Sequence, residues 1–186
     1  YVYEGSTLIS NIDIINNTVR NIHNTDSSGG YAGADGIMVQ GVVDDIDVLN
    51  NTVEHIHSAG WAYGIDVTPT TSAPNTPPTN VIVQGNTVQY INDGSIYPAA
   101  LSDPYNAPYP GVCLTIDETT PGADDGDASE VQAHLNNFIN TPVGAVNKDT
   151  SEILNATCNW WGAETGPTHE SNPDGTGTAV SDNITF

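Results

Sequence analysis

The sequence predicts an all-β fold, and two recurring phrases carry that prediction. The first phrase, I-D-I-I-N-N-T-V-R-N-I at 12–22, returns at 46–56, at 81–91 and, in a looser form, at 132–140. The second phrase, a Gly followed by alternating residues, occurs at 36–39, 64–67, 111–114 and 144–147. In both phrases apolar residues alternate with polar ones, and a period of two indicates a β-strand. Each repeat therefore supplies at least two strands.

The spacing of the repeats predicts how the strands are arranged. Aligning the first phrase on its second Asn gives a ladder of Asn17, Asn51, Asn86, Asn137 and Asn159. The steps are 34, 35, 51 and 22 residues, so a short repeat is interrupted by insertions of different lengths. Such a pattern is typical of a solenoid. With strands in each repeat, it predicts a right-handed single-stranded parallel β-helix of about five coils, with long loop insertions and an irregular C-terminal cap.

The aligned Asn residues have an expected structural role. Each interrupts two short strands at the same place, and Asn tolerates the left-handed backbone that a sharp turn requires. Stacked copies would place one side-chain amide over the next, where they can hydrogen-bond to one another. We therefore expect these residues to mark one corner of every coil.

The chain is expected to form one domain and to be a piece of a longer chain, because it begins without Met inside a strand-like segment. Residues 1–154 would form the coils with their inserted loops, and 155–186 the last coil edge and the capping segment. By strand alternation, Trp161 should be buried against the last coil and Trp160 should lie under the returning tail. Val180 and Ile184 should close over this end.

Charge is the most unusual feature of the composition. The chain has 2 Lys and Arg against 23 Asp and Glu, a formal net charge of −21. Self-repulsion of this size destabilises a fold unless salt screens it, which favours a protein of a halophile. Nucleic acid is excluded as a partner because phosphate binding needs the basic residues that are missing. The sequence also has no apolar run long enough to cross a bilayer.

The C-terminal region carries a family resemblance. The run A-T-C-N-W-W-G-A-E-T-G-P at 156–167, with the tail at 172–186, resembles the closing segment of secreted archaeal and bacterial β-helix repeat proteins. The repeats themselves resemble those of the pectate-lyase-like superfamily. This resemblance implies the β-helix fold, an extracellular or cell-surface location and a broad association with carbohydrate. It does not imply one activity.

Aromatic residues are concentrated in the loops that follow the first phrase. Aromatic rings cover the apolar face of a pyranose, so these residues are the carbohydrate-binding candidates. They are Tyr31, Trp61, Tyr63, Tyr97, Tyr105 and Tyr109. The alternative, which we favour slightly, is that these side chains pack the loops onto the coils.

Catalytic candidates are few. Lyases of the superfamily resemble one another in using a basic residue to remove the proton next to a uronate carboxylate. Arg20 and Lys148 are the only Lys and Arg residues, and they lie too far apart in coil order to share such a site. Hydrolysis by paired carboxylates is the better enzymatic reading, with Asp35, Asp66 and Asp93 as the aligned candidates.

Two clusters are candidates for metal binding, although no cofactor is expected to be required. Asp124, Asp125 and Asp127 could supply oxygen ligands to Ca²⁺, and His23, His55 and His57 could bind a transition metal. A solvated acidic face and stacked surface histidines are the favoured alternatives. Cys113 and Cys158 are expected to be free, packed thiols.

Together these observations favour a halophilic secreted or cell-surface module that serves as a non-catalytic scaffold or binds carbohydrate. The alternative is a polysaccharide-degrading enzyme, a glycoside hydrolase rather than a lyase, with its active face partly in this segment. The expected partner is a polysaccharide or surface glycan.

Overall fold

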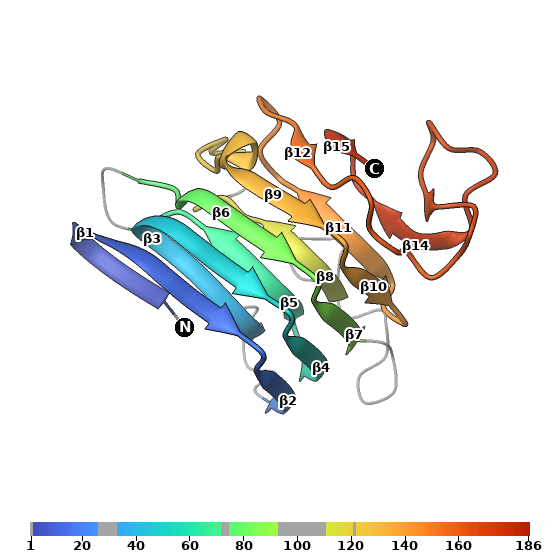
Figure 1. Ribbon diagram of the computed structural model, residues 1–186, viewed down its shortest axis with the longest axis horizontal. Coiled ribbons are helices and arrows are strands. Elements are labelled where there is room, and N and C mark those ends of the chain that lie inside the picture. Colours follow the sequence, from blue (N-terminus) through green and yellow to red (C-terminus); the bar gives the residue numbers. More distant parts are fainter. Residues whose placement is uncertain (1, 26–32, 72–74, 93–110, 121) are drawn as a thin grey trace.

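The computed structural model describes residues 2–25, 33–71, 75–92, 111–120 and 122–186, with side chains from residue 7 onward. This part of the chain is all-β and its strands form two parallel sheets that curl into a half-barrel (Figure 1). One short 3-10 turn, Ala128–Glu130, lies between the strands. The all-β, parallel prediction is therefore confirmed.

The larger sheet has eleven strands and the smaller has four. The larger sheet contains β1 (Val2–Ile15), β3 (Gly33–Leu49), β5 (Trp61–Thr68), β6 (Thr79–Gln84), β8 (Gly111–Ile116), β9 (Val131–His134), β11 (Val143–Asn147), β12 (Leu154–Asn155), β13 (Pro167–Thr168), β14 (Gly177–Val180) and β15 (Ile184–Thr185). The smaller sheet contains β2 (Thr18–Asn24), β4 (Thr52–Ser58), β7 (Thr87–Ile91) and β10 (Asn137–Ile139).

The larger sheet is itself bent, because β3 belongs to two rows of strands. Residues 33–40 of β3 pair with β5, whereas residues 44–49 pair with β6. Gly41, between these two parts, has a φ of 91°, a backbone conformation that suits Gly. We name the rows by their strands: row 1 runs through β3, β5, β8, β11 and β14; row 2 through β1, β3, β6, β9, β12 and β15; row 3 is the four-stranded sheet.

The core lies between the three rows. In row 2, Ile46 pairs with Val81 and Val81 with Val131, and all three side chains are buried. In row 3, Val53 pairs with Val88, and both are completely buried. Each such side chain contributes roughly 1.5–3 kcal/mol to folding. The alternating pattern of the sequence therefore points its apolar members inward.

The recurring Gly of the second phrase has a steric explanation. A Cβ at Gly36 would overlap the side chain of Val53, and a Cβ at Gly64 would overlap that of Val88. Rows 1 and 3 approach each other closely at these positions, and only Gly leaves room for the Val side chains. Packing between rows 1 and 3 therefore explains why Gly recurs in this phrase.

The Asn ladder exists, but its fourth member is Asn136 rather than Asn137. The backbone N–H and side-chain amide of each member donate to Oδ1 of the next, from Asn17 to Asn51, Asn86, Asn136 and Asn159. The predicted Asn137 instead pairs with Thr87 in row 3, and its side chain is exposed. The 132–140 copy was aligned one residue too late, because its first Asn occupies the ladder.

The left-handed turn also lies one residue earlier than predicted. The residues with positive φ precede the ladder members; they are Asn16 (58°), Asn50 (55°), Gly85 (68°), Leu135 (58°) and Cys158 (62°). The ladder Asn itself instead satisfies backbone groups of neighbouring repeats. Turning and stacking are thus divided between two adjacent residues.

The C-terminal end agrees with the sequence for one Trp and differs for the other. Trp161 is 3% exposed and its ring lies 5.3 Å from that of Phe138, while Val180 is buried in the same cluster and Ile184 packs against it partly buried. Trp160 was expected under the tail, but it is 43% exposed. The returning segment covers Trp161 and leaves Trp160 open to solvent.

Candidate active site

The side of row 1 that faces away from the main core carries a cluster of ionisable groups. Asp35 lies on β3 in register with Tyr63 of β5, and Asp66 of β5 is in register with Thr115 of β8. The positions on either side of Asp35, Ala34 and Gly36, face the main core, and so do Ile65 and Val67 on either side of Asp66. Alternation therefore places both carboxyl groups on the opposite side. We call Asp35, Asp66, Asp117 and Lys148, with Tyr63 and Thr115, the carboxylate cluster.

Lys148 is the cationic member of this cluster. Its Nζ lies 2.7 Å from Oδ1 of Asp117 and donates to Oη of Tyr63 over 3.0 Å. The same nitrogen lies 5.1 Å from the centroid of the Tyr63 ring. The Lys148 and Asp117 side chains keep 12% and 17% of their exposure, so this ion pair is mostly shielded from water.

The two other carboxyl groups are in an environment that favours their neutral form. Burial, assisted by the negative charge of Asp117 and opposed by the positive charge of Lys148, raises the pKa of Asp35 to about 7. Burial also raises the pKa of Asp66 well above its ordinary value, assisted by the charges of Asp117 and Asp35. One lysine does not compensate three adjacent carboxyl groups, so protons are retained.

Several polar atoms of the cluster are buried without a partner among the described residues. They are Oδ1 of Asp35, Oδ1 of Asp66 and Oγ1 of Thr115. Buried polar atoms are normally hydrogen-bonded, because leaving one unpaired costs about 1–3 kcal/mol. Such a cost is characteristic of groups arranged for chemistry or ligand binding rather than for stability.

The cluster has the components of acid–base chemistry. Asp35 can hold a proton near neutral pH, and Asp117 forms an ion pair with Lys148. A protonated carboxyl group can donate to a leaving oxygen while an ionised one attacks or activates water. Asp66, 3% exposed, is too buried to contact a polymer.

Of the three predicted catalytic carboxylates, the structure places Asp35 and Asp66 close enough for their charges to interact. Asp93 lies outside the described residues. Sequence reasoning missed Asp117 and Thr115, and it considered Lys148 only as lying too far from Arg20 in coil order to share a site with it. The available signal was that Asp117 and Lys148 each directly follow a strand that contains the Gly phrase, and the last residues of these two strands, Ile116 and Asn147, are in register.

The predicted carbohydrate-binding aromatics do not form an exposed platform in the part that the structure describes. Tyr63 is 1% exposed, and Trp61 is partly buried against a cluster of Tyr63, Val112, Val143 and Val146. Tyr31, Tyr97, Tyr105 and Tyr109 lie outside the described residues. The packing alternative therefore holds for Trp61 and Tyr63.

The predicted calcium loop uses its carboxylates for internal hydrogen bonds. Asp124 accepts from the backbone N–H groups of Thr150 and Ser151, Asp125 accepts from Asn75, and Asp127 accepts from Ser129. The hydrogen bonds from Thr150 and Ser151 lower the pKa of Asp124. The three carboxylates serve different segments and no metal-binding group of three His, Cys, Asp or Glu side chains occurs among the described residues.

The predicted histidine column is present, with His23 paired to His57 across β2 and β4. The rings of His23 and His57 are 5.2 Å apart, and those of His55 and His57 are 6.2 Å apart. His55 stacks on Tyr90 at 4.8 Å, and His57 is 1% exposed. Within the described residues these rings pack against aromatic neighbours and do not form a three-ligand metal site.

Both cysteines are free, as expected, and Cys113 is buried, but Cys158 is exposed and not packed as predicted. Across the described residues, no helix is both long and apolar enough to cross a membrane.

Comparison with known proteins finds no matching family, no matching curated protein and no matching solved structure.

Proposed function

We propose that this chain is part of a right-handed single-stranded parallel β-helix of the pectate-lyase-like type, and that its carboxylate cluster hydrolyses a glycan. The β-helix reading is supported by strand order, since the chain passes repeatedly from row 2 to row 3 to row 1. Each pass adds one parallel strand to each row, as stacked coils would.

The net charge of −21 supports a second part of the proposal, that the protein works outside the cell of a halophile. Molar salt reduces the range of charge repulsion to roughly 3 Å, so a chain this acidic stays folded there. The resemblance of the C-terminal segment to secreted β-helix proteins supports an extracellular or surface location.

The observation that carries the catalytic proposal is the proximity of a neutral and an ionised carboxyl group on one face of row 1. Asp35, with a pKa of about 7, would protonate the glycosidic oxygen of the leaving sugar. Asp117, paired with Lys148 at 2.7 Å, would act as the base or nucleophile.

A lyase mechanism fits this cluster less well. Elimination from a polyuronate needs cations that neutralise the substrate carboxylate. Lys148 is the one cation of the cluster, and its contacts with Asp117 and Tyr63 already use it. A neutral glycan is therefore the better substrate class.

The test is release of reducing ends from neutral polysaccharides in about 2 M KCl, where salt screens the repulsion between acidic residues. We expect activity from the unmodified chain and its loss in Asp35→Asn and Asp117→Asn. Asp45→Asn is the matched control, because Asp45 is exposed and its φ of 59° is tolerated by Asn. Absence of cleavage by the unmodified chain would leave the non-catalytic scaffold or binding module as its function.

A further inference from the structure

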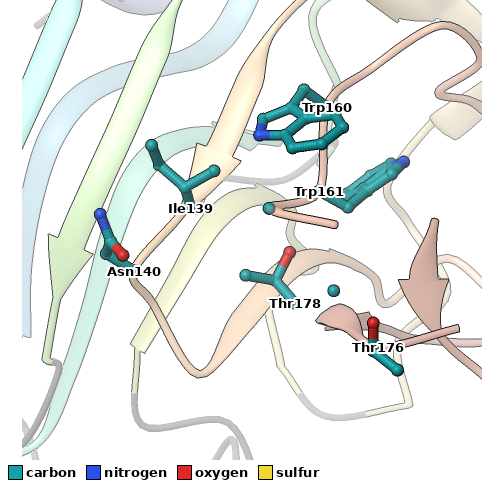
Figure 2. Close-up of a pocket in the computed structure, with 8 residues that line it drawn as sticks. Ile139, Asn140, Trp160, Trp161, Thr176 and Thr178 are labelled. Carbon is teal, nitrogen blue, oxygen red and sulfur yellow. The ribbon is translucent and has the colours of Figure 1, made fainter. Parts of the chain in front are cut away.

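A pocket lies at the C-terminal end of the sheets, away from the residues of the carboxylate cluster. It has a volume of about 300 Å³. Its described lining comes from the end of β10, the Trp pair and β14 (Figure 2); the residues are Ile139, Asn140, Trp160, Trp161, Gly162, Thr176, Gly177 and Thr178. We propose that this pocket binds a neutral pyranose residue of a glycan, with Trp160 as the stacking surface.

The two adjacent tryptophans have opposite environments. Trp161 is 3% exposed and packs on Phe138, so it holds the end of the core together. Trp160 is 43% exposed, and its large apolar ring gains little from folding. An exposed ring at the mouth of a pocket is a typical surface for the apolar face of a sugar.

The backbone that carries Trp160 is held on both sides. Its N–H donates to the carbonyl of Asn136 over 2.8 Å, and its carbonyl accepts from the N–H of Phe138 over 2.9 Å. Asn136 belongs to the ladder, so hydrogen bonds within the repeat hold the backbone of Trp160 in place. A side chain on a fixed backbone loses less entropy on ligand binding than one on a flexible loop.

Polar groups stand around the ring without filling the pocket. The hydroxyl of Thr178 donates to the carbonyl of Phe138 over 3.1 Å, which leaves its oxygen able to accept from a ligand. The Thr176 hydroxyl lies 2.8 Å from that of Thr165, and the Asn140 amide donates to Gln89 over 3.3 Å. These neutral groups match the hydroxyls of a sugar.

The charge of the lining selects the ligand class. None of the described residues that line the pocket is charged, although the chain carries 23 acidic residues. A uronate or sulfated sugar would meet no cation here and would be repelled by the net charge. A cationic ligand would find no carboxylate. A neutral sugar avoids both penalties, and the volume is at the low end of about 300–1,000 Å³ for ligand pockets.

The test is isothermal titration of a panel of neutral hexasaccharides, cellohexaose, laminarihexaose, mannohexaose and xylohexaose, in about 2 M KCl. Trigalacturonate is the anionic comparison. The titrated protein is the full chain carrying Asp35→Asn, so cleavage does not contribute to the signal. We expect one of the neutral ligands to bind and trigalacturonate not to bind.

Variants assign the binding to this pocket. Trp160→Ala should weaken it by about tenfold or more, a loss of roughly 1.4 kcal/mol. Thr176→Val should weaken it severalfold, and Ile153→Ala, which removes another exposed apolar side chain, should leave it unchanged. Melting curves must show that Trp160→Ala is as stable as the parent.

The proposal is overturned if the whole panel fails to bind at millimolar concentration, if Trp160→Ala binds like the parent, or if trigalacturonate binds best. Because the protein in these titrations is already cleavage-deficient, a failure of the hydrolase proposal does not affect their outcome. Conversely, loss of sugar binding in Trp160→Ala with reducing-end release intact would separate this pocket from the carboxylate cluster.

Discussion

The side-chain amide of Asn86 donates to Oδ1 of Asn136 over 3.0 Å, so the ladder passes through Asn136 and not through Asn137. Asn86 also donates to the carbonyl of Val48 over 2.8 Å, and its Oδ1 accepts from Asn51. One side chain thus satisfies two backbone groups of the preceding repeat and also bonds to the ladder Asn of the following one. Because of these bonds, we expect each ladder Asn to contribute strongly to the free energy of unfolding.

The first prediction compares Asn86→Ala with Asn137→Ala. The first change leaves the buried N–H of Asn51 and carbonyl of Val48 without partners, which should cost about 3 kcal/mol in the free energy of unfolding. The second removes an exposed side chain and should cost less than about 1 kcal/mol. Denaturant unfolding in molar KCl measures both, and equal losses would contradict the ladder.

The second prediction concerns pH. The pKa of Asp35 is about 7 in the folded state against an ordinary 3.8, so the folded protein keeps a proton that the unfolded chain releases. The free energy of unfolding should therefore fall as pH rises from about 4 to 7. Asp66 acts in the same direction. Asp35→Asn should reduce this fall and melt about 5 °C above the parent at pH 8.

Asp45→Asn is the control for the pH measurement, because it removes the same charge from an exposed corner. Its melting temperature should follow the parent at every pH. If Asp35→Asn and Asp45→Asn behaved alike, net charge rather than the buried cluster would explain the pH dependence. A gain in stability with a loss of cleavage is the pattern expected of a catalytic group.

The third prediction concerns salt. Asp13 and Asp47 occupy paired positions on β1 and β3, where like charges repel. The melting temperature should rise by about 10 °C or more between roughly 0.1 and 2 M KCl as repulsion is screened. Asp47→Asn should raise the midpoint at low salt and reduce the rise. A midpoint independent of KCl would remove the argument for a halophile.

The fourth prediction separates the two tryptophans by stability. Trp161→Ala removes a ring that packs on Phe138 and should cost about 3–5 kcal/mol. Trp160→Ala removes a half-exposed ring and should cost less than about 1 kcal/mol. Thermal melting of both variants is the measurement. Comparable losses would mean that Trp160 is a capping residue after all.

The fifth prediction concerns thiol reactivity. Burial raises the pKa of Cys113 to about 12, whereas Cys158 is exposed. The native protein should therefore react with a thiol reagent at Cys158 alone, and Cys113 should react only after unfolding. Cys158→Ser should abolish labelling of the native protein. Rapid labelling of that variant would show that Cys113 is accessible.

Local pattern was sufficient for the parallel all-β architecture, because alternation and repeat length are properties of neighbouring residues. The inward direction of Ile46 and Val53, the burial of Trp161 and most of the ladder followed from it. The ladder position in the 132–140 copy did not follow, because two adjacent Asn residues fit a phrase equally well. In the structure, the hydrogen bonds to Asn86 and Asn159 place Asn136 in the ladder, whereas Asn137 pairs with Thr87.

The carboxylate cluster shows what only the tertiary structure decided. Asp35 and Asp66 were recognisable as aligned acids, but Asp117 and Lys148 are separated from Asp35 by long insertions whose lengths conceal the register. Burial, which raises the pKa of Asp35, depends on every strand and loop around the site. The exposure of Trp160 likewise depends on the path of the returning tail. Alternation specifies which way a side chain points, whereas its neighbours and its access to water are set by segments far away in the sequence.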